Sequence, residues 1–352
     1  MKTKTLVLVL VVIMMVLVGA ISACSANLES DAAGADTVTL TLGAYTTPRE
    51  AYSEIIPLFQ AYWKEKTGQE VVFEESYLGS GAQSRAVVEG FEADVVALSL
   101  EADVTRMVDA GLITRDWHAA PNKGIVSTSV VVFAVRSGNP KDIQDWDDLA
   151  APGVEILTPN PKTSGGAQWN ILALYGAAKR GYIEGVAADD DAAAQAFLAQ
   201  VLANVTVMDK AARDSITNFE KGVGDLAITY ENEVLVAQLS GQDYDMVIPR
   251  STILIENPVA VVDAYAEKHG TQEVADAFVE FLFAEEAQRI YAKYGLRSVD
   301  ADVAADTAEL YPPVEDLFTI DYFGGWAKAT PDFFSDEGIF SQVLVDVQGS
   351  GD

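Results

Sequence analysis

The 352-residue chain is poor in cations, cysteine and histidine: 23 Lys and Arg stand against 53 Asp and Glu, with one cysteine and two histidines. This shortage of cations argues against nucleic-acid binding, since Lys and Arg that neutralise phosphates supply much of that affinity. The formal net charge of −30 would also repel an anionic bilayer. With a single cysteine no disulfide can form within the chain, so stability must come from the core. Charge alone suggests a cationic ligand or partner.

Composition and length indicate folded domains rather than an acidic disordered chain. Hydrophobic residues make up 49% and aromatic residues 9% of the sequence, which is ordinary for a globular protein. The length predicts about two domains, each able to bury a core of its own.

The N-terminus has the pattern of an export signal. Lys2 and Lys4 precede an apolar run over 6–18, and small residues lead to Cys24. This order is typical of a secretory signal, and the run is shorter than the roughly 20 residues that a membrane-spanning helix needs. The ending ISAC resembles the lipobox of bacterial lipoproteins, which implies cleavage of a signal peptide over 1–23, lipidation of Cys24 and anchoring to a membrane. A buried structural thiol is the alternative role for this cysteine.

Strand and helix patterns alternate after residues 24–37, a small and polar stretch that we expect to be a flexible tether. The expected strands are 38–42, 71–76, 93–100, 127–136, 154–159, 205–209, 226–231, 246–249 and 259–263. The expected helices are 48–67, 83–89, 165–177, 213–221 and 273–295. In the first helix, Thr47 is expected to cap the start, Glu50 to complete a capping box, and Tyr62 to lie on the buried face.

This alternation predicts an α/β fold with parallel sheets flanked by helices. The chain enters a second α/β unit near 137 and leaves it near 245. We therefore expect a two-lobed clamshell, with lobe I formed by 38–136 plus 246–352 and lobe II by 137–245. In open α/β sheets, ligands collect at the carboxyl ends of strands and the starts of helices.

Four strand-to-helix junctions share one composition, namely TTPR at 46–49, GSGAQ at 79–83, TSGGA at 163–167 and AARDS at 211–215. Each offers backbone N–H groups without an intrahelical partner, and small residues let a ligand approach the backbone. A helix N-terminus carries a partial positive charge, which favours an oxyanion. For any one junction, an ordinary capped turn explains the pattern. Two Gly-Ser clusters in different lobes favour an anion site between them.

Motifs of other chemistries are missing. The chain has no G-x-x-x-x-G-K-[ST] loop, no G-x-G-x-x-G helix start and no G-x-S-x-G elbow. A hydrolase would have Ser80 or Ser164 as nucleophile, but His118 and His269, the only histidines, lie in polar surroundings typical of a surface. No Cys and His cluster indicates a metal site, and Asp189–Asp191 is typical of a solvated face. We therefore expect neither an enzyme nor a cofactor.

Longer segments resemble the sulfate-binding proteins of ABC importers, over about 40–343. The segments that carry this resemblance are 79–99, 131–170, 222–235 and 317–329. Its most specific part is NPKTSGG at 160–166. The resemblance implies a type II periplasmic-binding-protein fold, with two α/β lobes joined by crossing strands. It also implies an extracytoplasmic receptor that delivers sulfate, or thiosulfate in close relatives, to a membrane permease; we expect it to act as a monomer.

The resemblance also implies how sulfate is held, by hydrogen bonds mostly from backbone N–H groups and without a charged side chain. The positions that match the family's site are Thr46, Ser80, Ser164, Gly165, Gly166, Ala212 and Tyr230. Two of them depart from the family pattern. Thr46 stands where members often have an aspartate that donates through its main chain, and Tyr230 replaces a tryptophan whose indole N–H donates to sulfate.

Selection among oxyanions depends on protons. Sulfate has none at neutral pH and suits a pocket made only of donors, whereas phosphate keeps at least one and requires an acceptor. Asp214 and Glu231 neighbour the matched positions, and either one pointing inward would favour phosphate. Molybdate would need a wider donor-only pocket. A cation or metal receptor remains the alternative that the charge suggests, although iron-binding relatives of this fold use clustered tyrosines and Tyr230 alone does not form such a cluster.

Overall fold

The computed structural model describes residues 37–349. The predicted signal peptide and Cys24 lie outside the described residues. The strands are β1 Thr37–Tyr45, β2 Glu70–Leu78, β3 Val95–Ala97, β4 Ile125–Arg136, β5 Ile156–Pro159, β6 Val205–Asp209, β7 Leu226–Tyr230, β8 Tyr244–Val247, β9 Ser251–Val261 and β10 Asp316–Phe318. The helices are α2 Arg49–Thr67, α3 Ser80–Val88, α4 Glu101–Asp109, α5 Trp146–Leu149, α6 Gly165–Lys179, α7 Asp191–Ala203, α8 Ala212–Glu220, α9 Glu231–Leu239, α10 Asp263–His269, α11 Gln272–Phe281, α12 Glu285–Lys293, α13 Ala301–Asp306, α14 Trp326–Ala329 and α15 Ile339–Gly349.

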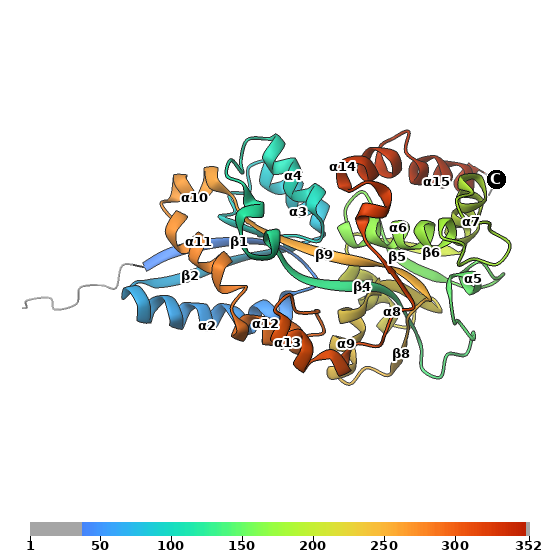
Figure 1. Cartoon of the computed structure of the whole chain (residues 1–352), viewed down its shortest axis with the longest axis horizontal. Helices are drawn as coiled ribbons and strands as arrows, with labels where there is room; N and C mark the ends of the chain where they lie inside the picture. The colour runs from blue at the N-terminus through green and yellow to red at the C-terminus, as the bar shows by residue number, and fades with distance from the viewer. Residues whose placement is uncertain (1–36, 350–352) are drawn as a thin grey trace, which may run out of the picture.

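The sheet confirms the α/β class. Its order is β2-β1-β3-β9-β4-β7-β5-β6, with β10 on β9 and β8 on β4. β1 is parallel to β2 and β3, and β5 is parallel to β6 and β7. The two long strands β4 and β9 pair antiparallel with each other and also with β7 and β3, respectively. Figure 1 shows β4 and β9 running between two groups of helices, so these two strands connect the halves of the molecule.

Each half has an apolar core of its own. The first half buries aromatic residues of α2, α11 and α12, among them Phe59, Phe278 and Tyr291. The second half buries residues of α6 and α7, among them Trp169 and Phe197. Two separate cores agree with two lobes, and the boundaries near 137 and 245 stay a prediction.

The C-terminal segment corrects the expected division of the chain. β10 pairs with the first residues of β9, at Ser251–Ile253, and α15 packs on α7. Trp326 of α14 stacks edge-on against Trp169 of α6, with ring centroids 4.7 Å apart. In Figure 1, α14 and α15 lie beside α6 and α7. Residues 316–349 therefore belong with the second half, not with lobe I as expected, because their apolar residues extend its core.

Two further expectations about helices are wrong. Helix α2 begins at Arg49 without a side-chain cap, so Thr47 and Glu50 form no capping box. Tyr62 is 39% exposed rather than buried. The single helix expected over 273–295 is two helices, α11 and α12, separated at 282–284.

Candidate functional site

Three of the four predicted helix starts meet across the boundary between the halves. A Cβ atom placed on Gly79, just before α3, would lie 2.6 Å from the carbonyl oxygen of Thr163 and 2.8 Å from that of Lys210. The N–H of Ala82 also donates to the Thr163 carbonyl oxygen at 3.1 Å. Thr163 precedes α6 and Lys210 precedes α8. The starts of α3, α6 and α8 therefore lie in direct contact.

The start of α2 joins the same region through an arginine. Arg213 of α8 donates to the two carboxylate oxygens of Glu50 at 2.5 and 3.0 Å and to the carbonyl oxygen of Thr47 at 3.4 Å. Thr46, a predicted site residue, is half-buried between β1 and this turn. All four predicted junctions are thus brought together.

Two of these helix starts are buried and uncapped. Neither α3 nor α8 has a side-chain cap. Their first residues, Ser80 and Ala212, are only 2% and 5% exposed. The first N–H groups of a helix have no partner within it, and buried N–H groups need one. Since the helix dipole adds a partial positive charge there, this arrangement favours a desolvated anion.

The side chain of Ser80 has a structural role. Its hydroxyl donates to Asp103 Oδ2 at 2.6 Å and accepts the Ser99 N–H at 2.9 Å. Arg106 in turn donates to the other oxygen of Asp103 at 2.8 Å. The single hydroxyl hydrogen of Ser80 is therefore already donated to the Asp103 carboxylate. Ser80 can contribute only its backbone N–H to an anion site.

The start of α6 brings Ser164, Gly165 and Gly166 into the same region. Ser164 is the N-cap, and its Oγ accepts the N–H of Ala167 at 3.4 Å. A Cβ on Gly165 would lie 2.7 Å from Ser99 Oγ, and one on Gly166 would lie 2.6 Å from the Tyr230 ring. Both positions require glycine because neighbouring side chains approach the backbone so closely. Their N–H groups belong to the first turn and need partners outside the helix.

Tyr230 reaches this region from the end of β7 and meets a residue that the sequence analysis missed. Its hydroxyl lies 2.5 Å from Ser99 Oγ. Ser99 follows β3, and its carbonyl oxygen accepts the indole N–H of Trp169 at 2.8 Å. The signal available in the sequence was its position, because Ser99 lies two residues after the buried strand β3 and ends the family-like segment 79–99. Burial raises the pKa of Tyr230, so its hydroxyl keeps its proton at neutral pH.

Neither Glu231 nor Asp214 supplies a free buried acceptor to the helix starts. Both oxygens of Glu231 accept from Arg297, at 2.7 and 2.9 Å. Asp214 is exposed. Burial raises the pKa of Glu231, and Arg297 opposes that shift. Phosphate would be favoured if Glu231 or Asp214 faced inward as a free acceptor. Neither residue does so.

Arg213 brings no uncompensated positive charge. Besides Glu50, it donates to Glu233 Oε2 at 2.6 Å. Burial opposes ionisation of Glu50, but the hydrogen bonds and charge of Arg213 outweigh it and hold the pKa of Glu50 below its usual value. Two carboxylates thus face one guanidinium, so the charge of Arg213 is balanced within the protein.

The two histidines lie elsewhere. His269 is hydrogen-bonded to Asp94 at 2.8 Å and to Glu92 at 3.0 Å. His118 lies 3.3 Å from Asp116. Neither has a contact with Ser80 or Ser164, so no histidine is placed to activate these serines as nucleophiles.

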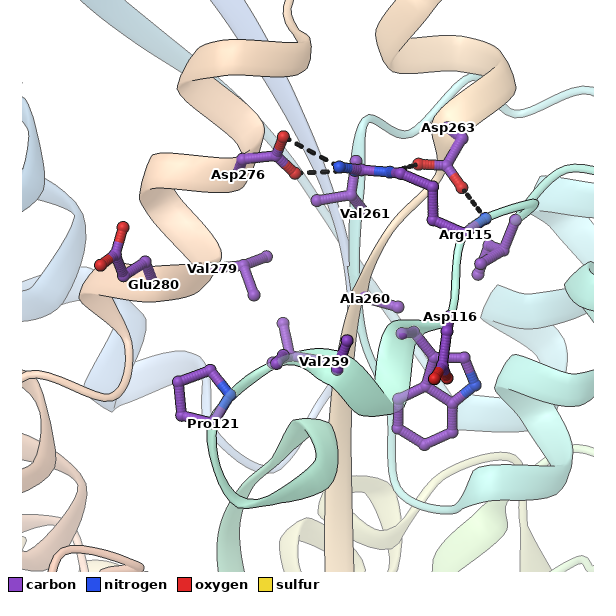
Figure 2. A pocket seen from close by; sticks show the side chains of 14 residues that line it. Arg115, Asp116, Pro121, Val259, Ala260, Val261, Asp263, Asp276, Val279 and Glu280 are labelled. Carbon is purple, nitrogen blue, oxygen red and sulfur yellow. Dashed lines mark hydrogen bonds and ion pairs between the residues drawn. The ribbon is translucent and has the colours of Figure 1, made fainter.

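A cavity of about 460 Å³ lies in the first half, away from the helix starts. Figure 2 shows its walls, which include Arg115, Val261, Asp263 and Asp276. The guanidinium of Arg115 is bound by both aspartates, at 2.6 Å to Asp263 and 2.7 Å to Asp276. The cation of this cavity is thus already paired. Within residues 37–349, no group of three or more His, Cys, Asp or Glu side chains is arranged to hold a metal ion, and no helix there has the length and apolar character to cross a membrane.

Comparisons with known proteins show which family the chain resembles in sequence and fold. A family model described as bacterial extracellular solute-binding protein matches residues 40–297. The sulfate-binding protein of Synechococcus elongatus is 46% identical over 332 residues, which cover 94% of this chain and 93% of that protein. The thiosulfate-binding protein of Escherichia coli is 35% identical, covering 86% and 89%. The solved structure of the sulfate-binding protein SubI from Mycobacterium tuberculosis is similar with a TM-score of 0.78 and 39% identity, covering 85% of this chain and 100% of that one.

Proposed function

The chain belongs to the bacterial extracellular solute-binding protein family, and we propose that it captures sulfate between its two halves and delivers it to an ABC importer. The observation that supports this most directly is the meeting of buried, uncapped helix starts, at Ser80 of α3 and Ala212 of α8, beside the glycines of α6. Proteins similar over almost the whole chain are sulfate-binding by name.

The proposed site has seven residues that donate to sulfate, five of them through the backbone. The backbone donors are Thr46, Ser80, Gly165, Gly166 and Ala212, and the side-chain donors are Ser164 and Tyr230. Sulfate is fully ionised at neutral pH and accepts at every oxygen, so a set of donors matches it without a proton to place. Helix dipoles would stabilise the dianion, and Arg213 at the start of α8 is already paired with Glu50 and Glu233.

Thiosulfate is the second candidate. The 35% identity to a thiosulfate-binding protein supports it, and thiosulfate is also a tetrahedral dianion without a proton. It differs in one terminal sulfur, which is larger and a weaker acceptor than oxygen. Titration of both anions separates the two candidates.

The family and the signal-like pattern of the N-terminus support a cellular location for this protein. We propose that the receptor is extracytoplasmic, with a lipid on Cys24 that holds it at the outer face of a membrane close to its permease. Two or more acyl chains would give stable anchoring, since a single chain binds only marginally. Mass spectrometry of protein from its own host tests the lipid, because an unmodified N-terminus before residue 24 would contradict the proposal.

Calorimetric titration of the purified protein with sulfate, thiosulfate, phosphate and molybdate tests the function. We expect sulfate to bind at micromolar concentration and Gly165→Asp to abolish binding, because the new carboxylate occupies the site and repels the anion. Ala187→Asp, which adds the same charge at an exposed position, is the matched control and should bind normally. No heat of sulfate binding to the unaltered protein at these concentrations would reject the proposed function.

A further inference from the structure

Two buried hydroxyl groups from opposite halves of the molecule meet at the proposed site. Ser99 follows β3 in the first half and is 0% exposed. Tyr230 ends β7 in the second half and is 1% exposed. Their oxygens are 2.5 Å apart, and either one is able to donate to the other. We call Ser99 and Tyr230 the hydroxyl pair.

The hydroxyl pair has one hydrogen and three lone pairs left over. Each hydroxyl has one hydrogen and two lone pairs. One hydrogen is used between the two oxygens, and in the described part of the chain neither oxygen has another hydrogen-bond partner. The oxygen that gives its hydrogen to the other keeps both of its lone pairs, and the other oxygen keeps its hydrogen and one lone pair. The pair therefore presents both a donor and an acceptor.

The pair lies against the first turn of α6. Ser99 Oγ would be 2.7 Å from a Cβ on Gly165, and the Tyr230 hydroxyl would be 3.2 Å from a Cβ on Gly166. These two glycines provide the N–H groups of the proposed sulfate site. An anion bound to those N–H groups thus lies next to the hydroxyl pair.

Asp103 and Glu231 do not offer the same acceptor, whereas Glu233, paired with Arg213 through Oε2, keeps its buried Oε1 without a hydrogen-bond partner among residues 37–349. Asp103 accepts from Ser80 and Arg106, and Glu231 accepts from Arg297 at both oxygens. An indole N–H, which the family's tryptophan offers at position 230, is a donor only. Replacing it with a hydroxyl adjacent to Ser99 changes a pure donor into a group that also accepts.

We propose that the hydroxyl pair admits singly protonated tetrahedral oxyanions, such as hydrogen phosphate, to the sulfate site; this inference rests on the proposed function. Sulfate accepts the spare hydrogen of the pair. Hydrogen phosphate accepts the same hydrogen and donates its own proton to one of the free lone pairs. The buried proton of the anion is thereby satisfied, which removes the main penalty against phosphate in a donor-only pocket.

The first test uses the unaltered protein. Purified protein is loaded with radiolabelled sulfate, and inorganic phosphate is added at neutral pH. We expect phosphate to displace sulfate at an excess of less than about a thousandfold. Sulfate that binds but is not displaced at that excess would overturn this inference alone, whereas absence of sulfate binding would reject the proposed function itself.

A double substitution then assigns the effect to the pair. In the double variant Ser99→Ala, Tyr230→Trp, both hydroxyls are gone and the indole offers a donor only, so the ratio of the phosphate Kd to the sulfate Kd should rise by about tenfold or more. Tyr62→Trp, at an exposed residue of α2, is the control and should leave the ratio unchanged. An equal ratio in the double variant and the unaltered protein would contradict the proposal. If the double variant fails to fold, as judged by circular dichroism, the displacement experiment still decides.

Discussion

At the scale of single residues, the two serines of the Gly-Ser loops have opposite hydrogen-bond roles. Ser80 Oγ joins the Asp103 carboxylate to the Ser99 N–H, and all three residues are buried. Ser164 Oγ only accepts a long bond of 3.4 Å from the Ala167 N–H, so its hydrogen is free for a ligand. Ser80 thus stabilises the loop, while Ser164 is available to bind.

Substituting each serine with alanine should separate stability from binding. We expect Ser80→Ala to lower the free energy of unfolding by about 1–3 kcal/mol, because a buried carboxylate and a buried N–H lose their partner. Ser164→Ala should weaken sulfate binding by about 1–2 kcal/mol, the cost of a hydrogen bond to a charged group. Urea unfolding without anion measures the first effect, and calorimetry measures the second. A larger loss of stability in Ser164→Ala than in Ser80→Ala would contradict this assignment.

His269 gives the fold a pH dependence. It bonds Asp94 and Glu92, and Lys268 also pairs with Glu92. Burial alone would lower the pKa of His269, but its hydrogen bonds to the two carboxylates and their charges raise it above the ordinary 6.5. Because the folded pKa lies above the unfolded one, this stabilisation is complete below the unfolded pKa and disappears as the pH rises through the folded pKa.

We therefore expect His269→Gln to lose most stability in acid. The difference in unfolding free energy between the unaltered protein and His269→Gln should be large at about pH 6 and small at about pH 9. Urea unfolding at the two pH values measures it. His118→Gln, at a histidine with looser contacts, serves as control. A His269→Gln difference that does not change with pH would count against the ion pairs.

At the scale of elements, local pattern predicted more than long-range pairing. The strand over 205–209 was predicted with its bounds as found, since its apolar alternation is local. The first half of β9 was missed, because its role as a crossing strand depends on β4. The break between α11 and α12 was also missed. There Gln288 donates to the carbonyl oxygens of Leu282 and Val126, a tertiary contact that helical periodicity does not reveal.

The candidate site shows the same limit. Helix starts at Ser80, Ser164 and Ala212 were predictable because Gly, Ser and Ala mark such turns. Ser99 was not, since its position after a strand suggested no partner, and its role depends on Tyr230 lying opposite it. Glu50 was predicted as a local cap but pairs with Arg213 on another helix. The Glu50 carboxylate pairs with Arg213 on a distant helix and therefore does not cap its own helix. The spacing of residues in the sequence does not reveal such a distant partner.

The ion pair between α2 and α8 should contribute to closure of the two halves. Glu50→Gln removes its charge but leaves Arg213 paired with Glu233. The Glu50 side chain is 33% exposed, so we expect solvent to limit the loss of sulfate affinity to about 0.5–1 kcal/mol. Calorimetry measures the affinity, and small-angle scattering measures whether the anion-free form is more open. Glu70→Gln, in the exposed pair with Lys64, should change neither. Equal affinities of Glu50→Gln and the unaltered protein would show that the pair does not favour the closed form.

At the scale of the whole molecule, net charge and ligand charge have the same sign. The chain has a formal charge of −30, while the proposed ligand is a dianion held by helix starts. Bound sulfate interacts with those dipoles at contact distance, whereas most carboxylates lie on the surface and are screened within about 10 Å at 0.1 M salt. The initial inference of a cationic ligand from charge alone is therefore not supported by the site. Net charge determines the electrostatic field that an approaching anion experiences outside the protein. It does not determine the local potential in the binding pocket.

That field should slow the arrival of sulfate, and salt should relieve it. Association of like-charged partners becomes faster as ionic strength rises. We expect the association rate constant for sulfate to increase with added sodium chloride, while the dissociation rate constant changes little because the buried contacts are poorly screened. Stopped-flow fluorescence measures both, since buried Trp169 donates to the Ser99 carbonyl beside the site and is positioned to report occupancy. As the control, sucrose replaces sodium chloride at the same osmolarity. An association rate constant that falls as salt is added would mean that local positive potential at the cleft mouth, rather than the acidic surface, governs the encounter.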